Sequence, residues 1–547
     1  MRMNVLPTNL LRLRSPGLAL IAAALLVACA SAPPPRAPLK LTILHTNDHH
    51  GHFWTNADGE YGLAARKTLV DRIRAEVAAE GGQLLLLDGG DINTGTAESD
   101  LQDAEPDFKG MNLLGYDASA VGNHEFDKSW AVLSKQRGWA RFPLLSANIY
   151  RDGQRLFEPY RIFAKGGYRI AVVGLTTEDT PKMELPDNVR GLEFRRPAAE
   201  LAKLMPELRA QADMVIAATH MGHYADARHG VSAPGDVEMA REVAGLDLIV
   251  GGHSQNPICM LAENQRNNNY VPGQPCAPDR QNGAWIVQAH EWGKYVGRAD
   301  FVIDAGKIQL VRYQLIPVNL MRTASDGSKA PYTELLAQDP AVRAYLAPFQ
   351  AAGDELLSVP VGRSKGTFDG SRAAVRSRPT NLGILVTRAM LERTGADVAL
   401  INGGGLRDSL PAGAISYRDV RKVLPFGGTL AVVELTGREL LDYLRVAVSM
   451  TPGSGGFPHT SGVTLRVQDG QMLDVRVGGK PLDLERHYKL AINHFSAVGG
   501  DGYPRLDKHP AHVDTGFFDD EVLRKYVEQH SPLEPADYDP AGNSFKR

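Results

Sequence analysis

The sequence lacks a strong charge of either sign. Its 60 lysine and arginine residues nearly balance 63 aspartate and glutamate residues, for a formal net charge of −3. A protein that binds a nucleic-acid polymer normally has a basic surface, so the composition gives no indication of such a partner. Small anionic ligands stay compatible with it, because a local pocket of arginines can bind phosphate. Internal repeats are also absent, and the one biased segment is an Ala- and Pro-rich stretch at 30–38.

Long hydrophobic runs are missing as well. The apolar run Leu18–Val27 is too short for a comfortable transmembrane helix. It follows three arginines, and this pattern predicts a secretory signal peptide at 1–28. The run ends in Leu26-Val27-Ala28-Cys29, which resembles a bacterial lipobox, whose cysteine is lipidated and becomes the first mature residue. We expect a periplasmic protein anchored to the outer membrane through Cys29 and a flexible tether at 29–38; an ordinary signal peptide cleaved nearby is the alternative.

Cysteine is scarce, with three residues in the chain. If Cys29 carries a lipid, Cys259 and Cys276 remain as a pair, 17 positions apart in a segment rich in Pro, Gly and Asn. In an oxidising compartment this spacing predicts a disulfide that closes a loop, and two free thiols are the alternative. Closing a loop of that size contributes about 3 kcal/mol in the chain-entropy model.

The 547-residue chain has the composition of an ordinary globular protein, with 43% hydrophobic and 22% charged residues. Apolar strand-like runs alternate with helical patterns, which predicts an α/β fold with strands buried on both faces. The predicted strands of the first region are 39–45, 83–87, 118–121, 168–175, 214–218, 246–250 and 285–288. We predict a first domain at 39–332, a connecting helix at 333–358 and a second α/β domain at 359–547, with helices at 381–394 and 437–450 flanking a strand at 398–401.

Polar residues follow the predicted strands at the points where the strands end. They are Asp48 and His50, then Asp91, then Asn123, His124 and Asp127, then His220, and last His253 and Gln255. Ligand sites in open α/β sheets lie beyond the carboxyl ends of the strands, so these groups are expected to meet at one rim. Any one fragment is weak, because an isolated histidine is more often structural and an aspartate beside glycine is often only a turn. Five fragments in this order indicate a metal site.

This set of donors indicates two divalent metal ions. Carboxylate, imidazole and amide oxygen suit Zn, Mn, Fe or Co, and no thiolate accompanies them. Asp48 and His50 leave an extended segment on the same side. Asp91 is the candidate bridging ligand, because Gly89 and Gly90 before it allow the backbone to approach the ions closely. Two ions about 3.5–4 Å apart acidify a water and clamp phosphate oxygens during an in-line displacement. Structural or supporting roles are expected for His45, His49, His52, His223, His229 and His290.

Several motifs resemble those of a known family. Asn47-Asp48-His49-His50, Gly90-Asp91, Gly122-Asn123-His124-Glu125, Thr219-His220 and Gly252-His253-Ser254-Gln255 resemble the signature of calcineurin-like metallophosphoesterases. The longer runs 44–54 (LHTNDHHGHFW), 289–298 (AHEWGKYVGR) and 499–505 (GGDGYPR) are more specific and resemble bacterial periplasmic UDP-sugar hydrolases/5′-nucleotidases. The resemblance extends from about residue 39 to the C-terminus. It implies a four-layer αββα metallophosphoesterase domain followed by an α/β substrate-binding domain.

The resemblance also implies roles for individual residues. Asp48, His50, Asp91 and Gln255 would hold one ion, and Asp91, Asn123, His220 and His253 the other. His124 would face the scissile phosphate and stabilise developing charge or protonate the leaving oxygen, with Asp127 orienting its imidazole. The alternative for His124 is a remote supporting hydrogen bond.

Three arginines of the second domain are candidates for binding the substrate. Guanidinium groups bind phosphate or carboxylate through two hydrogen bonds. Arg372, Arg376 and Arg407 match positions that line the substrate site of the family, and Arg407 follows the glycines 403–405. Ordinary surface arginines are the alternative, which would be preferred for Arg372 alone.

Two phenylalanines, Phe426 and Phe495, match the base clamp of the family. Stacking on an aromatic ring contributes ~1–3 kcal/mol per base, whereas ordinary core packing is the commoner fate of phenylalanine. Asp501 is expected to accept a hydrogen bond from a ribose hydroxyl, and Asn402 to touch the base. The family closes by a large domain rotation, so we expect hinge residues near 355–362.

The leading hypothesis is hydrolysis of nucleoside 5′-phosphates and UDP-sugars for nucleotide salvage outside the cytoplasm, by a monomer with two divalent ions, Zn, Mn or Co foremost. Two alternatives stay open. One is a 2′,3′-cyclic-nucleotide 2′-phosphodiesterase/3′-nucleotidase, which shares the metals and domains. The other is a non-catalytic nucleotide-binding surface lipoprotein, against which the complete ligand set argues.

Overall fold

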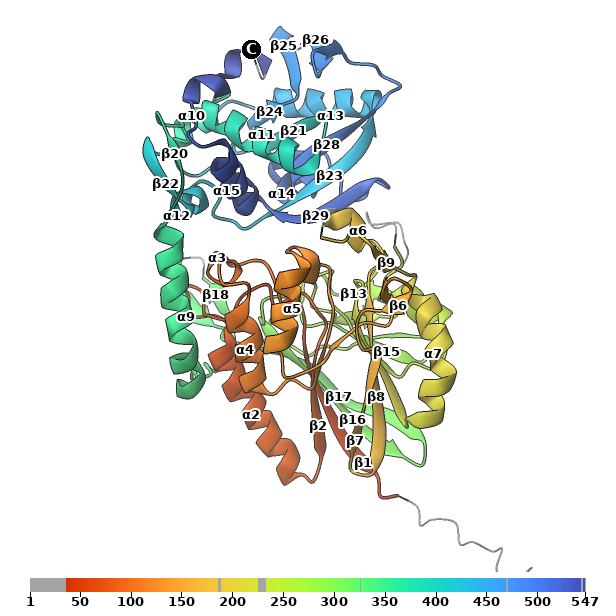
Figure 1. Ribbon diagram of the computed structural model, residues 1–547. Helices are drawn as coiled ribbons and strands as arrows, with labels where there is room; N and C mark the ends of the chain where they lie inside the picture. Colours follow the sequence, from red (N-terminus) through yellow and green to blue (C-terminus); the bar gives the residue numbers. More distant parts are fainter. Residues whose placement is uncertain are drawn as a thin grey trace, which may run out of the picture.

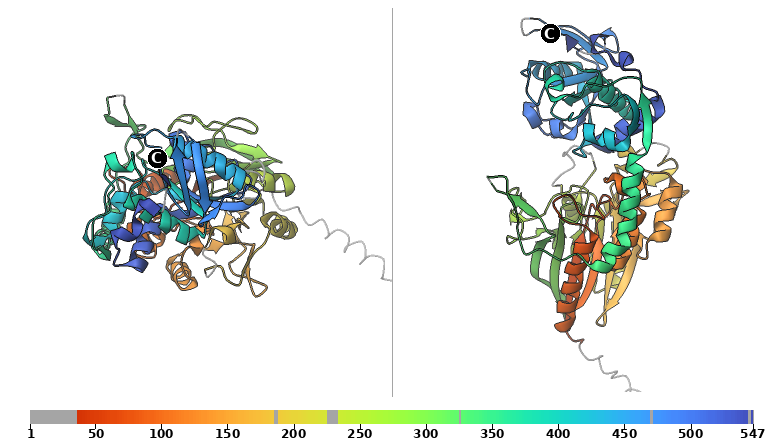
Figure 2. Two further views of the ribbon diagram at one scale, coloured as in Figure 1. Left: turned by 90° about the horizontal axis from the view of Figure 1, so that it is seen from above. Right: turned by 90° about the vertical axis from the view of Figure 1, so that its left-hand side faces the viewer.

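The computed structural model describes residues 36–184, 188–224, 233–324, 326–468, 471–542 and 545–546. The predicted signal peptide, Cys29, most of the tether and His229 lie outside the described residues. Within the described part, no helix has both the length and the apolar character needed to cross a membrane. Two domains are stacked end to end, and a single long helix runs along the side of the lower one and leads into the upper one (Figures 1 and 2).

The N-terminal domain contains two six-stranded sheets. Their strand orders are β17-β16-β1-β2-β3-β4 and β14-β15-β11-β10-β8-β7. The first sheet comprises β1 (Leu39–Thr46), β2 (Gln83–Asp88), β3 (Ala118–Ala120), β4 (Leu144–Leu145), β16 (Tyr295–Asp304) and β17 (Lys307–Pro317). The second comprises β7 (Tyr160–Lys165), β8 (Tyr168–Thr176), β10 (Met214–His220), β11 (Leu248–Val250), β14 (Asp279–Gln281) and β15 (Ala284–Val287).

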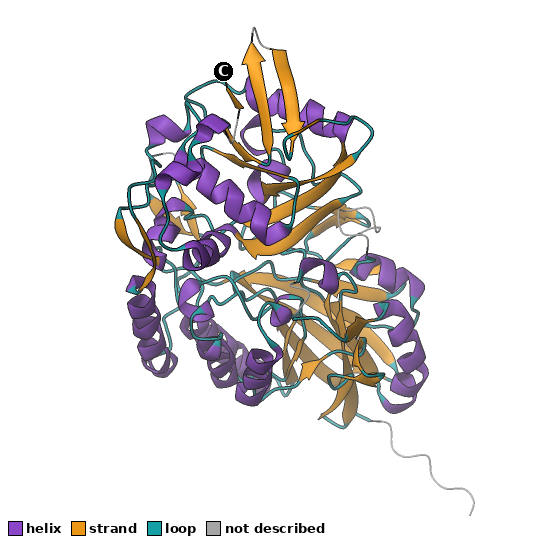
Figure 3. Ribbon diagram, turned by 45° about the horizontal axis from the view of Figure 1, so that its top comes forward, coloured by secondary structure: helices purple, strands orange, loops and turns teal. Residues whose placement is uncertain are grey.

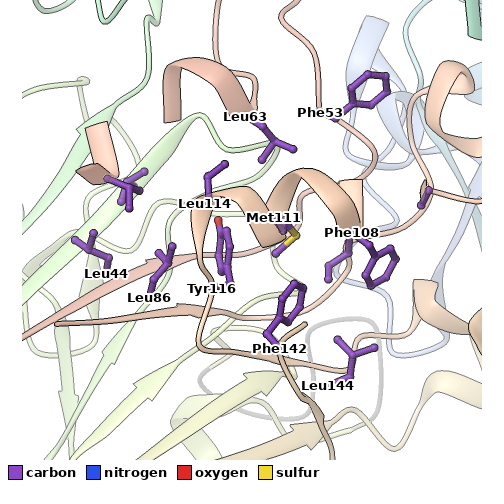
Figure 4. Packing of buried hydrophobic residues seen from close by; sticks show 14 of the residues in the cluster. Leu44, Phe53, Leu63, Leu86, Phe108, Met111, Leu114, Tyr116, Phe142 and Leu144 are labelled. Atoms are coloured by element: carbon purple, nitrogen blue, oxygen red, sulfur yellow. The ribbon is translucent and has the colours of Figure 1, made fainter. Parts of the chain in front are cut away.

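The strands consist of continuous apolar runs, and successive side chains point to opposite faces of a strand. Both faces of each sheet are therefore apolar and can be buried. Leu41 packs with Ile170 and Ile216 in the core between the two sheets. Leu44 and Leu86 point the other way, into a core beneath the helices (Figure 4). Helices α2 (Leu63–Ala79), α4 (Glu105–Leu114) and α5 (Trp130–Trp139) cover the first sheet, and α7 (Pro197–Gln211) and α8 (Asp236–Glu242) cover the second. The predicted four-layer αββα fold is confirmed.

The central strands of each sheet are parallel. β1 pairs with β2 and β2 with β3, while β8 pairs with β10 and β10 with β11, each in parallel register. Their carboxyl ends therefore lie at a common edge of the two-sheet stack, and this edge faces the C-terminal domain (Figure 1).

The connecting helix α9 (Pro340–Ser358) begins later than the predicted start at residue 333. Asp339 caps it, because its carboxylate accepts hydrogen bonds from the backbone N–H groups of Ala341 and Val342 at 3.0 and 2.9 Å. Pro340 suits the first helical position, where its missing N–H costs nothing. Residues 333–339, which were predicted to belong to the helix, are therefore not helical.

The C-terminal domain is built on a mixed five-stranded sheet in the order β24-β21-β28-β23-β29 (Figure 3). Its strands are β21 (Val398–Asn402), β23 (Thr429–Thr436), β24 (Pro458–Ser461), β28 (His487–Asn493) and β29 (His512–Phe518). One core contains residues of α11 (Asn381–Thr394), α12 (Tyr417–Val423) and α15 (Asp519–His530), and α13 (Gly437–Ser449) contributes to a second core. This domain is α/β, as predicted.

Candidate metal centre and nucleotide site

Segments at the ends of the central strands bring the predicted metal ligands together. Asp48 and His50 follow β1, Asp91 follows β2, Asn123 follows β3, His220 ends β10, and His253 and Gln255 follow β11. The sequence predicted one rim of an open sheet. The structure instead uses the neighbouring edges of two sheets, because the sheets pack face to face with their parallel strands ending on the same side.

Asp91 lies at the centre of this group. Its Oδ2 atom is 2.8 Å from His220 Nε2 and 3.8 Å from His50 Nε2. The same Nε2 atom of His50 is 3.8 Å from Asp48 Oδ1. Asp91 therefore stands between the two proposed groups of ligands, as a bridging carboxylate must.

The remaining ligands complete the ring. His253 Nδ1 lies 3.0 Å from Asn123 Oδ1, and the backbone N–H of His253 donates to Asp48 Oδ2 at 3.0 Å. The side-chain amide of Gln255 lies 2.8 Å from His50 Nε2. All seven predicted ligands thus form one continuous set of contacts.

The backbone is strained around these residues. Five of the seven have a positive φ, between 48° and 76°: Asp48, His50, Asp91, His253 and Gln255. Non-glycine residues adopt this conformation rarely, and such strain concentrates at functional sites. Close packing adds a further constraint, because a Cβ atom at Gly122 would lie 2.0 Å from Asp91 Oδ1.

The polar atoms fit a divalent metal centre. His50 Nδ1 is 2.7 Å from the carbonyl oxygen of Thr94, and His220 Nδ1 is 2.8 Å from that of Gly89. Each Nδ1–H is thereby used, and the lone pair of each Nε2 is left for a ligand bond. His220 Nε2 is buried and has no hydrogen-bond partner among the described residues, although Asp91 is close. Oxygen and imidazole donors of this kind suit two divalent cations.

The charges in the centre are mutually dependent. Burial, reinforced by the neighbouring charge of Asp91, raises the pKa of Asp48 to about 8. Burial opposes ionisation of Asp91 too, but the positive charges of His220 and His124 outweigh it and hold the pKa of Asp91 below its usual range. A site that must use imidazolium groups as counterions for its carboxylates is suited to bind cations in their place.

His124 and Asp127 form the predicted dyad. His124 Nδ1 donates to Asp127 Oδ2 at 2.8 Å, and His124 Nε2 lies 3.9 Å from Asp91 Oδ2. Burial lowers the pKa of His124, but the charges of Asp127 and Asp91 outweigh burial and raise it well above the usual value. The imidazole is therefore held as a proton donor beside Asp91.

The C-terminal domain covers this dyad with a strand that the sequence did not suggest. A Cβ atom at Gly516 of β29 would lie 2.5 Å from His124 Cε1. The ring of Phe518 lies 6.3 Å from that of His124 and 6.2 Å from that of His50, centroid to centroid. β29 therefore closes over His124 and His50 in this arrangement of the domains.

Glu125 is a supporting residue that the sequence analysis did not single out. Its carboxylate accepts hydrogen bonds from the backbone N–H groups of Gly122, Asp91, Ile92 and Asn93. These groups belong to the two loops that carry Asp91 and Asn123. Glu125 therefore joins the two loops, and its place directly after Asn123-His124 is the signal that would have indicated it.

The three predicted arginines lie together in the second domain. Burial, followed by the positive charges of Arg372 and Arg407, lowers the pKa of Arg376. Among the described residues, no carboxylate or hydrogen-bond acceptor pairs with any of the three guanidinium groups. Arg407 lies 5.4 Å from the ring centroid of Phe426. The charge of Asp501 offsets part of the fall in the pKa of Arg376, but three positive charges with no carboxylate hydrogen-bonded to them among the described residues still provide a site for an anion.

The two predicted clamp phenylalanines are unusually open to solvent. Phe426 is 62% exposed and Phe495 is 51% exposed, so neither serves as a core residue. Asp501, exposed and with φ of 54°, accepts a hydrogen bond from Asn402 at 2.8 Å. Asn402 is buried, and its oxygen accepts from Asn493 at 3.0 Å. This arrangement favours Asn402 as the support of Asp501 over the direct base contact that we expected.

The other histidines have the structural surroundings that the sequence analysis expected. His49 Nε2 lies 2.9 Å from Asp107, His223 Nε2 lies 2.9 Å from Asp279, and His52 stacks on Trp292 with ring centroids 4.5 Å apart. The remaining two described ones are His45, buried in β1, and His290, in the loop after β15. Cys259 and Cys276 form the predicted disulfide, with their Cα atoms 4.9 Å apart.

Comparison with known proteins identifies the family. The calcineurin-like phosphoesterase model matches residues 41–257, and the 5′-nucleotidase C-terminal domain model matches residues 360–508. Protein UshA of Yersinia enterocolitica is 56% identical over 513 residues, which are 92% of this chain and 93% of that protein. The chain belongs to the 5′-nucleotidase family. The 5′-nucleotidase of Vibrio cholerae is 51% identical, over 95% of this chain and 97% of that protein.

Family membership makes the chain a metal-dependent phosphoester hydrolase, and it accounts for the donor set described above. Among solved structures, the NAD nucleotidase of Haemophilus influenzae has a TM-score of 0.75 at 22% identity and covers 91% of this chain and 98% of its own. That similarity supports the same two-domain fold.

Proposed function

We propose that this enzyme hydrolyses nucleoside 5′-phosphates, and UDP-sugars with them, at a dinuclear metal centre. The convergence of seven oxygen and nitrogen donors around Asp91 is the observation that carries the proposal. Asp48, His50, Asp91 and Gln255 would hold one ion, and Asp91, Asn123, His220 and His253 the other. When bound, two divalent ions supply an acidified water and neutralise phosphate charge.

The residues of the chain itself perform the remaining tasks. Asp127 accepts the Nδ1–H of His124 and so keeps Nε2 directed toward Asp91. His124 then stabilises charge on the phosphate and gives a proton to the departing oxygen. Arg372, Arg376 and Arg407 bind the negative charge of the nucleotide, and Phe426 and Phe495 stack on its base.

Hydrolysis requires the substrate-binding arginines and phenylalanines of the C-terminal domain to meet the metal ligands of the N-terminal domain. In this structure, the arginines and clamp phenylalanines make no contact with the metal ligands among the described residues, and β29 covers His124 instead. We infer that the C-terminal domain rotates, with a hinge near 355–362, where α9 leads into β20 (Pro360–Ser364). Glu98→Cys with Arg421→Cys replaces a pair whose carboxylate and guanidinium lie 3.5 Å apart across the domains, and joining the two cysteines with a bifunctional thiol reagent should stop turnover. Undiminished turnover of the crosslinked protein would contradict the rotation.

A substrate panel tests the proposed reaction. Purified protein loaded with Mn²⁺ or Co²⁺ should release phosphate from AMP and cleave UDP-glucose, and Asp91→Ala should abolish both activities. Retained turnover by metal-loaded Asp91→Ala would refute the assignment of the centre. Preference for 2′,3′-cyclic AMP or 3′-AMP would support the 3′-nucleotidase, and nucleotide binding without phosphate release would support the non-catalytic alternative.

The site and its setting lead to further proposals. The donor set favours Zn, Mn or Co as the ions, and we expect the enzyme to act as a periplasmic monomer in nucleotide salvage. Mass spectrometry of the mature N-terminus tests whether Cys29 is lipidated.

A further inference from the structure

Three titratable side chains gather beside the dinuclear centre: His124, Asp127 and Glu184. One potential ligand atom from each lies within 4.8 Å of the other two. His124 and Asp127 are already joined by the 2.8 Å hydrogen bond of the dyad. Glu184 comes from a different part of the chain, directly after the short helix α6 (Thr180–Met183), which packs against β29.

Glu184 has no part in the chemistry proposed above. Its side chain is 5% exposed, and neither carboxyl oxygen receives a hydrogen bond from a donor among the described residues. The carboxylate of Asp127, which has no proton to give, and the imidazole of His124, whose Nδ1–H is already used, share the cluster with it, and the guanidinium of Arg393 acts on it from the C-terminal domain. Burial, together with the charge of Asp127, raises the pKa of Glu184 well above its usual value. Two buried acids held together in this way need a cation, or must leave one of them neutral.

We propose that His124, Asp127 and Glu184 form a third divalent-cation site, separate from the seven ligands of the dinuclear centre. Two carboxylates and an imidazole are a ligand set for Zn²⁺ or Mn²⁺, and their two negative charges balance one divalent ion. An ion in this site binds the imidazole of His124 and the carboxylate of Asp127. It therefore disrupts the hydrogen bond by which Asp127 orients that imidazole. If the proposed function holds, occupancy of this site inhibits turnover.

The C-terminal domain supplies a competing positive charge. Arg393 of α11 lies 3.7 Å from the ring centroid of Phe517 and, with Asp127, lines a water-sized cavity of about 10 Å³. Burial lowers the pKa of its guanidinium, and the charges of Glu521, then of Asp127 and Glu184, offset part of this fall. Arg393 therefore opposes an ion in the third site whenever the domains are arranged as here.

Counting bound ions tests the site directly. Full-length protein is dialysed against increasing Mn²⁺, and bound metal is measured by mass spectrometry. Wild type should take up a third ion above the two of the centre, whereas Glu184→Gln and Glu184→Ala should stop at two. Glu485→Gln makes the same chemical change at an exposed residue and should bind as wild type does. Arg393→Gln should strengthen uptake of the third ion.

Activity gives an independent result. Hydrolysis of AMP by wild type should rise and then fall as Mn²⁺ increases, and Glu184→Gln should move the fall to concentrations at least about tenfold higher while keeping the maximum. Because ion counting needs no turnover, the two proposals fail separately. If wild type is inactive but binds a third ion that Glu184→Gln does not bind, only the proposed function is refuted. An active enzyme whose ion count and inhibition are unchanged in both Glu184 variants would refute the site.

Discussion

Glu125 offers a sharp test of how the two ligand loops are held together. Its Oε2 atom accepts from the backbone N–H groups of Gly122 and Asp91 at 2.6 and 3.2 Å, and Oε1 accepts from those of Ile92 and Asn93 at 2.9 and 3.3 Å. Glu125→Gln keeps one oxygen and turns the other into an NH2 group. Two buried N–H donors then lose their acceptor and face a donor instead.

The structure sets the size of the expected loss. Each unsatisfied buried donor costs about 1–3 kcal/mol, so two of them should lower the free energy of unfolding by about 2–6 kcal/mol. Because the loops carry Asp91 and Asn123, metal affinity should fall about 10- to 100-fold, as it does when groups that orient ligands are removed.

Two measurements check this prediction. Urea unfolding of the metal-free protein gives the stability, and calorimetric titration with Mn²⁺ gives the affinity. Glu485→Gln serves as the matched control, because Glu485 is exposed and far from the centre in the chain. Glu125→Gln with a stability and a metal Kd equal to those of the control would show that the four hydrogen bonds do not hold the loops.

Three further predictions follow from individual residues. Burial lowers the pKa of His45 to about 3, so its neutral form is favoured in the folded state; stability should be lost as pH falls from 6.5 toward about 3, by roughly 5 kcal/mol, and His45→Leu should flatten this part of the pH profile of chemical unfolding. Gly516→Ala should displace the C-terminal domain from the catalytic histidine and change the small-angle scattering curve, whereas Gly413→Ala, equally left-handed but with open space around it, should not; identical curves would exclude the contact. Removing the disulfide by Cys259→Ser with Cys276→Ser should lower stability under oxidising conditions by about 3 kcal/mol, and an unchanged thermal midpoint would contradict this.

Local sequence patterns were enough to predict most of the helices and strands. The run 381–394 predicted α11 without error, and the apolar run at 83–87 predicted β2 to within one residue, because periodicity and flanking glycines are properties of the local chain. The predicted start of α9 was wrong, because residues 333–338 also look helical in sequence whereas the cap at Asp339 and Pro340 decide where hydrogen bonding begins. Asn402 was expected to touch the base, and its hydrogen bonds with Asp501 and Asn493 favour a supporting role instead, so the base contact stays an untested prediction.

The amino-acid sequence by itself determined which donors stand at the strand ends, since strands and the residues that follow them are set by neighbours along the chain. Only the tertiary structure decided that two facing sheets bring Asp91 between His220 and His50, because that depends on how separate layers pack. It alone placed Glu184 against the dyad and Gly516 over His124, since these contacts join segments about 60 and almost 400 residues apart, and no local pattern encodes them.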